Sequence, residues 1–225
     1  MLWLVTLPLS AESALPVHPV QSYTAEYTVH LNGLKVGELH RRLAHQEDGY
    51  YLLETRAQTT GVAAWFKPDI AVETTRWHFV EGSPRPLTYT YHYTGRNEER
   101  LERLDFDWEN GTLTSLRRGK TSQLELAPGV LDKQVFEIAL QQAIGSGLKS
   151  DTFPVVSRGR ITDYTFRVVG REEVVTKPFG TVETVKVKRD STTLWMAPAQ
   201  GYLVVKIQHD ERGNTAMSYI TSVQY

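Results

Sequence analysis

Residues 23–33 read Tyr-Thr-Ala-Glu-Tyr-Thr-Val-His-Leu-Asn-Gly. Apolar and aromatic side chains alternate with polar ones as far as Leu31, which is the period of a strand with one buried face. Asn32-Gly33 then supplies the two residues of a tight hairpin turn, and residues 34–43 return as its partner strand. This stretch predicts an antiparallel hairpin, and most of the chain repeats its design.

Alternating or β-branched segments recur at short intervals along the rest of the chain, separated by turn residues such as Asn110-Gly111. Helices do not alternate with the strands in this order, which argues against a parallel α/β fold. The strand candidates are 50–59, 70–80, 87–94, 104–109, 112–117, 152–156, 161–169, 174–175, 182–188, 193–196, 202–207 and 215–223.

One helix is predicted near the middle of the chain, at about residues 131–145. Its apolar residues fall at helical spacing, Asp132 is placed to cap its start, and Gly145-Ser146-Gly147 ends it. The predicted fold is mainly β: one large antiparallel sheet of about ten strands. Twist curls such a sheet into a half-barrel or barrel, or splits it into a sandwich. We expect the helix to cover one opening, and residues 22–225 to form a single domain.

Composition excludes several classes of protein. The 225 residues include 25 Lys and Arg, 26 Asp and Glu, and no cysteine. The lack of cysteine excludes disulfides, a cysteine-based zinc site and a thiol nucleophile. The net charge of −1 argues against nucleic acid as a partner, since such binders usually carry a basic surface.

Residues 1–21 are expected to be an export signal followed by a linker. Residues 2–9 form an apolar run of signal-peptide length, too short to span a bilayer as a helix, and Ala11-Glu12-Ser13 fits a small-x-small cleavage pattern. The first basic residue is Lys35, so the usual basic start is missing. A start further upstream, a poor signal and an apolar first strand remain open alternatives. The signal predicts a periplasmic protein.

Several motifs occur together in one order: the alternating strand ending in its Gly-bearing return, Thr59-Thr60-Gly61 followed by Trp65-Phe66, and three later strand-and-turn segments. Those later segments are 164–168, 176–181 and 195–207. Over about residues 22–223, this order resembles the exported bacterial proteins catalogued as domain of unknown function 3108. The resemblance implies a β-rich periplasmic protein. It implies no catalytic residues.

No catalytic or metal-binding motif stands out, and we predict neither a cofactor nor a metal site. Asp105 and Asp107 share a strand face and would suit glycoside hydrolysis, but they alternate with Leu104 and Phe106, which indicates a solvent-facing side. His78 and His92 lie on successive strands but lack a third ligand. The sequence therefore favours a protein that is not an enzyme, with an unrecognised hydrolase as the less favoured reading.

Aromatic side chains are the best candidates for a binding site. Trp65 and Phe66 follow a stretch without strand period, where they would rim a cavity or close the end of the sheet. Tyr89, Tyr91 and Tyr93 form a stripe that would line the concave side of a curled sheet. We predict an exported binding module that holds an apolar, lipid-like ligand there. The alternative is a structural or partner-binding protein of the cell envelope, with a filled core and no ligand.

Overall fold

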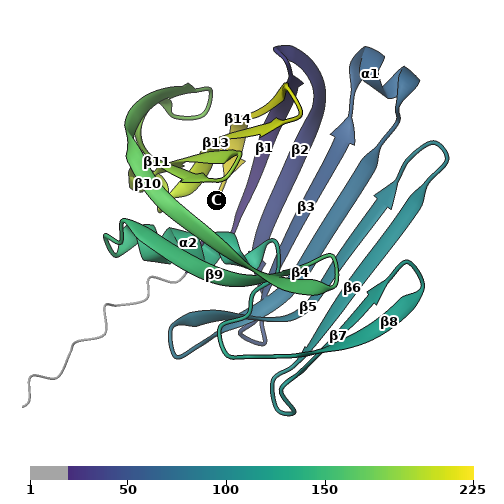
Figure 1. Cartoon of the computed structure of the whole chain (residues 1–225). Coiled ribbons are helices and arrows are strands. Elements are labelled where there is room, and N and C mark those ends of the chain that lie inside the picture. Colours follow the sequence, from purple (N-terminus) through teal and green to yellow (C-terminus); the bar gives the residue numbers. More distant parts are fainter. Residues whose placement is uncertain (1–19) are drawn as a thin grey trace, which may run out of the picture.

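A computed structural model describes residues 20–225, and about two thirds of them belong to one antiparallel sheet of fourteen strands (Figure 1). The strands are β1 (Tyr23–Leu31), β2 (Leu34–His45), β3 (Tyr51–Thr59), β4 (Ile70–Val80), β5 (Ser83–Thr94), β6 (Glu99–Asp107), β7 (Thr112–Arg117), β8 (Lys120–Glu125), β9 (Ser150–Ser157), β10 (Arg160–Thr176), β11 (Gly180–Arg189), β12 (Thr192–Ala197), β13 (Leu203–Glu211) and β14 (Asn214–Gln224). The helices are α1 (Gly61–Phe66), α2 (Val135–Gly145) and the short 3-10 turn η1 (Pro198–Gln200).

The first strand, β1, lies in the middle of the sheet. The strand order is β8-β7-β6-β5-β4-β3-β2-β1-β14-β13-β12-β11-β10-β9, so β1 pairs with both β2 and β14. The first eight strands run outward to one edge as successive hairpins. The chain then passes through α2 to the opposite edge and returns to the centre. Because β8 and β9 do not pair, the sheet curls without closing, as Figure 1 shows.

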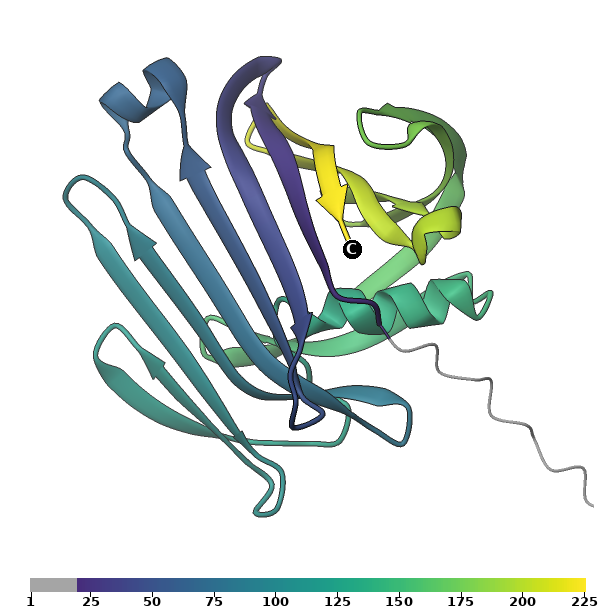
Figure 2. The same cartoon turned by 180° about the vertical axis from the view of Figure 1, so that it is seen from behind.

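α2 lies across one half of the concave side of the sheet, as the two opposite views show (Figures 1 and 2). Its Val135, Ile138 and Leu140 are completely or almost completely buried. They join one large core whose sheet side includes Leu53 and Trp77. We call this covered part the lower half of the concave face. The turns β1–β2 and β5–β6, together with α1, mark the opposite end, which we call the upper rim.

The hairpin β9–β10 is buried at the end of β9, just before its exposed turn. Val155 packs in the main core, while its neighbour Val156 packs in a second cluster with Tyr89 and Leu104. The free edge of β9 is capped by Leu131, whose N–H donates to Pro154 O and whose carbonyl accepts from Val156 N. The two clusters fill the lower half of the curl from both sides of this hairpin.

The predicted fold class is confirmed, with differences in detail. The sheet has fourteen strands where about ten were expected, partly because β8 is short and polar and shows no alternation. The helix predicted at 131–145 is observed as Val135–Gly145, and the Asp132 carboxylate accepts the N–H groups of Gln134 and Val135 at its start. α1 was not predicted. The expected export signal lies almost wholly outside the described residues. Within them, no helix is long and apolar enough to cross a membrane.

Candidate functional site

The concave face is built in layers that follow from strand register. Residues paired across neighbouring strands point to the same side of a sheet. One row of cross-strand partners runs through the middle of the concave face and carries mostly polar side chains. We call it the polar belt, and it consists of Arg41, Thr55, Glu73, Tyr91, Glu102 and Arg117.

Below the polar belt, the side chains of the concave face are part of the hydrophobic core. Above it, on strands β2 to β5, the side chains are only partly buried. The next row down includes Leu43, Leu53 and Leu104, all at 1 % exposure or less. The next row up reads Leu39, Ala57, Ala71 and Tyr93, which we call the apolar row. All four residues of the apolar row are only half-buried. The side chains that cover the lower half therefore stop at the polar belt.

The segment leading into α2 is what contacts the polar belt. Gln134 accepts a hydrogen bond from Thr55 Oγ1 at 2.7 Å and donates from Nε2 to Leu53 O at 3.3 Å and to Thr75 Oγ1 at 3.2 Å. On α2 itself, Glu137 pairs with Arg41, whose side chain is only 8 % exposed. Burial disfavours the charge of Arg41, but Glu137 and two nearby tyrosines outweigh it and raise the pKa of the guanidinium.

Lys133 lies over the aromatic part of the belt. Its Nζ is 4.7 Å from the centre of the Tyr91 ring and 5.2 Å from that of Tyr89. The Glu73 carboxylate lies 3.8 Å from the same ammonium and accepts the Tyr89 hydroxyl proton at 2.6 Å. Burial and Glu73 together raise the pKa of Tyr89, so this phenol stays protonated. Glu102 is 5 % exposed, and one of its oxygens has no hydrogen-bond partner.

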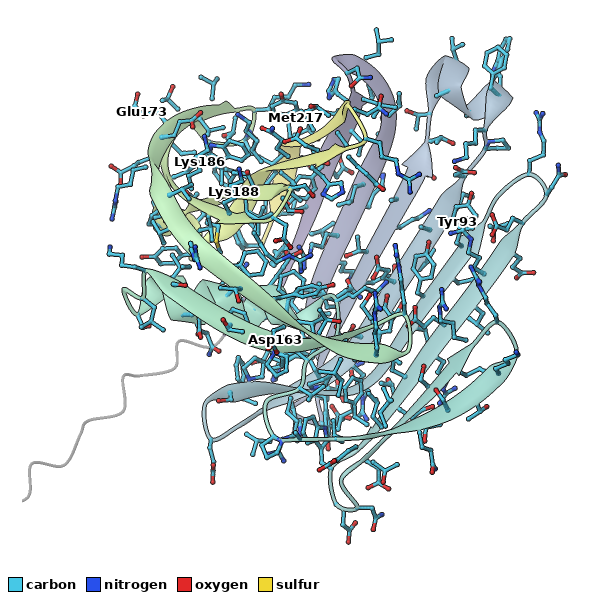
Figure 3. The ribbon with its side chains drawn as sticks, in the orientation of Figure 1. Tyr93, Asp163, Glu173, Lys186, Lys188 and Met217 are labelled. Carbon is cyan, nitrogen blue, oxygen red and sulfur yellow. The ribbon has the colours of Figure 1, made fainter. Side chains whose placement is uncertain are left out.

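The tyrosine stripe of β5 lies on the concave face and crosses all three layers. Tyr89 is fully buried, Tyr91 is half-buried in the polar belt, and Tyr93 reaches the upper rim (Figure 3). Trp65 and Phe66 lie on α1, where they are 80 % and 75 % exposed and fill no part of the core. The structure therefore brings Tyr93 near the α1 aromatics and places Tyr89 away from them.

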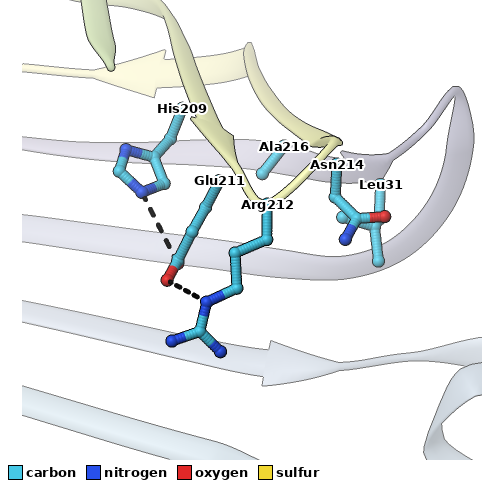
Figure 4. A pocket seen from close by; sticks show the side chains of 6 residues that line it. All are labelled: Leu31, His209, Glu211, Arg212, Asn214 and Ala216. Carbon is cyan, nitrogen blue, oxygen red and sulfur yellow. Dashed lines mark ion pairs between the residues drawn. The ribbon is translucent and has the colours of Figure 1, made fainter. Parts of the chain in front are cut away.

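Two open hollows lie at the upper rim. The first has a volume of about 300 Å³ and is shown in Figure 4. Its side chains come from the ends of the β1–β2 and β13–β14 hairpins. Glu211 lies between two neighbours, 3.9 Å from His209 Nε2 and 3.7 Å from Arg212 Nε. The residues lining it are Leu31, His209, Glu211, Arg212, Asn214 and Ala216.

The second hollow, of about 440 Å³, lies beside α1 and contains Tyr93. Asp69 is its centre: it accepts the Tyr93 hydroxyl proton at 2.8 Å and pairs with Lys67 at 2.9 Å. Gly95 closes one side, because a Cβ at this residue would lie 2.7 Å from Tyr93 Oη and 3.0 Å from Asp69 Oδ1. The bond to Asp69 raises the pKa of Tyr93.

Gly95→Ala should separate Tyr93 from Asp69, because the added methyl group needs the space of the phenol oxygen. We expect the pKa of Tyr93 to fall toward its ordinary value of 10.0, with a stability loss of about 1 kcal/mol for the lost hydrogen bond. NMR titration of protein labelled on tyrosine rings measures this pKa. Asn97→Ala, in the same turn, is the control and should leave it unchanged. An unshifted Tyr93 in Gly95→Ala would contradict the assignment.

Sequence reasoning missed the charged members of the polar belt. A signal was present, since strand alternation places Arg41 between the inward-facing Leu39 and Leu43. The carboxylates weighed for glycoside hydrolysis lie elsewhere: Asp105 pairs with Arg103 on the outer side of β6. Among residues 20–225, no group of three or more His, Asp or Glu side chains is placed to hold a metal ion.

The fold and the concave face define a curled, unclosed β-sheet protein, and no catalytic family is indicated. The chain belongs to the family described as "Protein of unknown function (DUF3108)", which matches residues 26–221 and confirms the resemblance. No curated protein matches the chain.

A similar solved structure is the beta-barrel-like protein of domain of unknown function DUF1849 from Brucella abortus. It has a TM-score of 0.57 and 11% sequence identity, over 90% of this chain and 97% of that one. At this identity the likeness shows a shared fold.

Proposed function

We propose that this chain is an exported, non-enzymatic binding module that holds a lipid-like ligand against the apolar row. The observation that carries the proposal is the layering of the concave face. Cover from α2 and the β9–β10 hairpin ends at the polar belt. The apolar row above it remains half-buried: Leu39 packs at the border of the main core, while Ala57, Ala71 and Tyr93 belong to neither core cluster.

The layering also suits an amphiphile with one polar end. An apolar body lying along Leu39, Ala57 and Ala71 would meet Lys133, Glu73 and Tyr91 where it reaches the belt. Each CH₂ removed from water contributes roughly 0.8 kcal/mol. A ligand that loses contact for three methylenes would therefore bind about 50-fold more weakly.

The edges of the sheet favour this function over partner binding by strand addition. β8 reads Lys-Thr-Ser-Gln-Leu-Glu and is almost wholly exposed, and charged side chains on an edge strand disfavour pairing with another chain. The other edge, β9, contains Pro154 and is capped by Leu131. A structural or partner-binding protein remains the alternative, and the experiment below distinguishes it.

Two neighbouring substitutions on β4 test the proposal. Ala71 is in the apolar row and Val72 points to the opposite side of the sheet, and both are half-buried. Ala71→Arg places a guanidinium in the proposed site, which an apolar ligand cannot compensate. We expect native mass spectrometry of protein from envelope extracts to show a bound apolar mass in the wild type and Val72→Arg, and a loss of about tenfold or more in Ala71→Arg.

Either of two results would overturn the proposal. The first is wild-type protein that is free of ligand in repeated preparations, which favours the partner-binding alternative. The second is equal occupancy in Ala71→Arg and Val72→Arg. Far-UV circular dichroism of both variants shows whether each retains the sheet. The mass of the N-terminal peptide of the same samples tests export, because cleavage after the predicted signal removes the apolar run at residues 2–9.

A further inference from the structure

α1 forms an apolar projection on the upper rim. None of its residues is buried, and Val62, Trp65 and Phe66 are 70 %, 80 % and 75 % exposed. Leu34, at the start of the adjacent strand β2, is 73 % exposed. We call these four side chains the rim patch. Figure 1 shows α1 standing above the ends of β3 and β4.

The projection is held by hydrogen bonds at its base. Thr60 N donates to Val36 O at 3.0 Å, and Thr59 Oγ1 donates to Lys67 O at 2.7 Å. On the other side, Arg96 donates from Nη2 to the carbonyl of Trp65 at 2.8 Å. These bonds fix the backbone that carries Trp65 and its apolar neighbours. The side chains are thereby held in water, where exposed apolar surface is unfavourable.

Two cations, Lys67 and Arg96, lie beside the rim patch. The side chain of Lys67 is 74 % exposed, next to Phe66. Arg96 forms no ion pair with any carboxylate among residues 20–225, whereas Asp69 and Glu98 at the same rim are paired with Lys67 and Arg100. Within the described part of the chain, Arg96 is therefore an unpaired positive charge beside the exposed aromatic rings, while the Lys67–Asp69 and Arg100–Glu98 pairs balance their own charges.

We propose that the rim patch inserts into the surface of an anionic lipid bilayer. Tryptophan and phenylalanine side chains favour the membrane interface, and each nearby arginine or lysine is attracted to anionic headgroups. A bilayer accepts a few projecting side chains without a complementary surface, which a protein partner would need. Insertion brings the upper rim against the membrane, with the apolar row on the rim side of the polar belt. The inference goes beyond ligand binding and stands if the concave face holds nothing.

Co-sedimentation of the full chain with ligand-free vesicles tests the inference. The vesicles are phosphatidylcholine alone, or phosphatidylcholine mixed with phosphatidylglycerol. We expect the wild type to bind the mixed vesicles. The double variant Trp65→Ala/Phe66→Ala should bind them at least about tenfold more weakly, because it removes most of the inserted apolar surface. Arg96→Gln should lose about fivefold on the mixed vesicles only, since it removes one charge near the membrane.

The matched control is Leu148→Ala/Val175→Ala, which removes two exposed apolar side chains away from the rim patch, at 48 % and 79 % exposure. It should bind as the wild type does. Absence of wild-type binding to mixed vesicles, or equal losses in the rim and control variants, would overturn the inference. All altered side chains are exposed, and thermal melting of each variant confirms that folding is unchanged. The vesicles carry no extracted ligand, so this result is independent of the ligand experiment.

Discussion

Glu137→Gln should lower the free energy of unfolding by about 3–5 kcal/mol, the usual effect of leaving one charge of a buried pair without its partner. The side chains of Arg41 and Glu137 are only 8 % and 16 % exposed. Arg41 bonds Glu137 through Nη1 and its Nε has no hydrogen-bond partner among the described residues, so the protein offers the guanidinium little compensation beyond Glu137. Urea denaturation at neutral pH measures the loss.

Two controls separate the missing partner from lost packing. Replacing both residues, as Arg41→Met/Glu137→Leu, should destabilise the protein much less than Glu137→Gln, because no buried charge remains. The exposed pair Arg171–Glu183 provides the second control. There, Glu183→Gln should change stability by less than about 1 kcal/mol. A Glu137→Gln variant as stable as Glu183→Gln would show that the buried pair does not hold α2 in place.

The ion pair has a wider role, because it belongs to the contact that divides the concave face. Glu137, Gln134 and Lys133 all come from the segment at the start of α2, and all three contact the polar belt. These contacts reach Arg41, Thr55 and Glu73 of the belt from the side of the lower half. A ligand that enters from the upper rim therefore meets apolar side chains first, and the belt sets the depth that it reaches.

Strand alternation explains why the sheet was predictable from the sequence. In β1, Tyr23, Ala25 and Tyr27 are buried and the polar residues between them are exposed, as the period requires. The Asn32-Gly33 turn has positive φ at both residues, at 49° and 86°, which matches the hairpin predicted there. These features are local, so they can be read from neighbouring residues.

Other features depend on contacts between distant segments. α1 has six residues and no side-chain cap, and a hydrogen bond from Thr60 to β2 fixes its start. Arg41 and Glu137 are 96 residues apart, so their pairing follows only from the register of the sheet and the position of α2. The location of the tyrosine stripe was predictable, but which tyrosine stays accessible depends on where α2 ends its cover.

Asp132→Asn should abolish a loss of stability that the wild type shows as the pH rises from about 4 to about 6. Asp132 is completely buried, and burial raises the pKa of its carboxyl from 3.8 to about 6. One oxygen accepts from Gln134 N, Val135 N and Thr75 Oγ1, while the other has no partner. The protein thus holds the acid in its neutral form more strongly than the unfolded chain does.

The sign of the effect follows from proton binding. Between pH 4 and 6 the folded state holds a proton on Asp132 that the unfolded state has released, so raising the pH favours unfolding. A pKa difference of about two units corresponds to roughly 3 kcal/mol across this window. Above it, this carboxyl adds no further slope. Other carboxylates titrate in the same range, so the informative quantity is the difference between wild type and variant.

Urea denaturation of both proteins at intervals from pH 4 to 8 measures that difference. The amide oxygen that the substitution introduces can still accept the three hydrogen bonds, so the start of α2 should be retained. Asp163→Asn, an exposed carboxylate on β10, is the control and should keep the wild-type slope. If Asp132→Asn and the wild type lose stability in parallel between pH 4 and 6, the buried carboxyl does not titrate there. The fixed start of α2 would then be insensitive to pH.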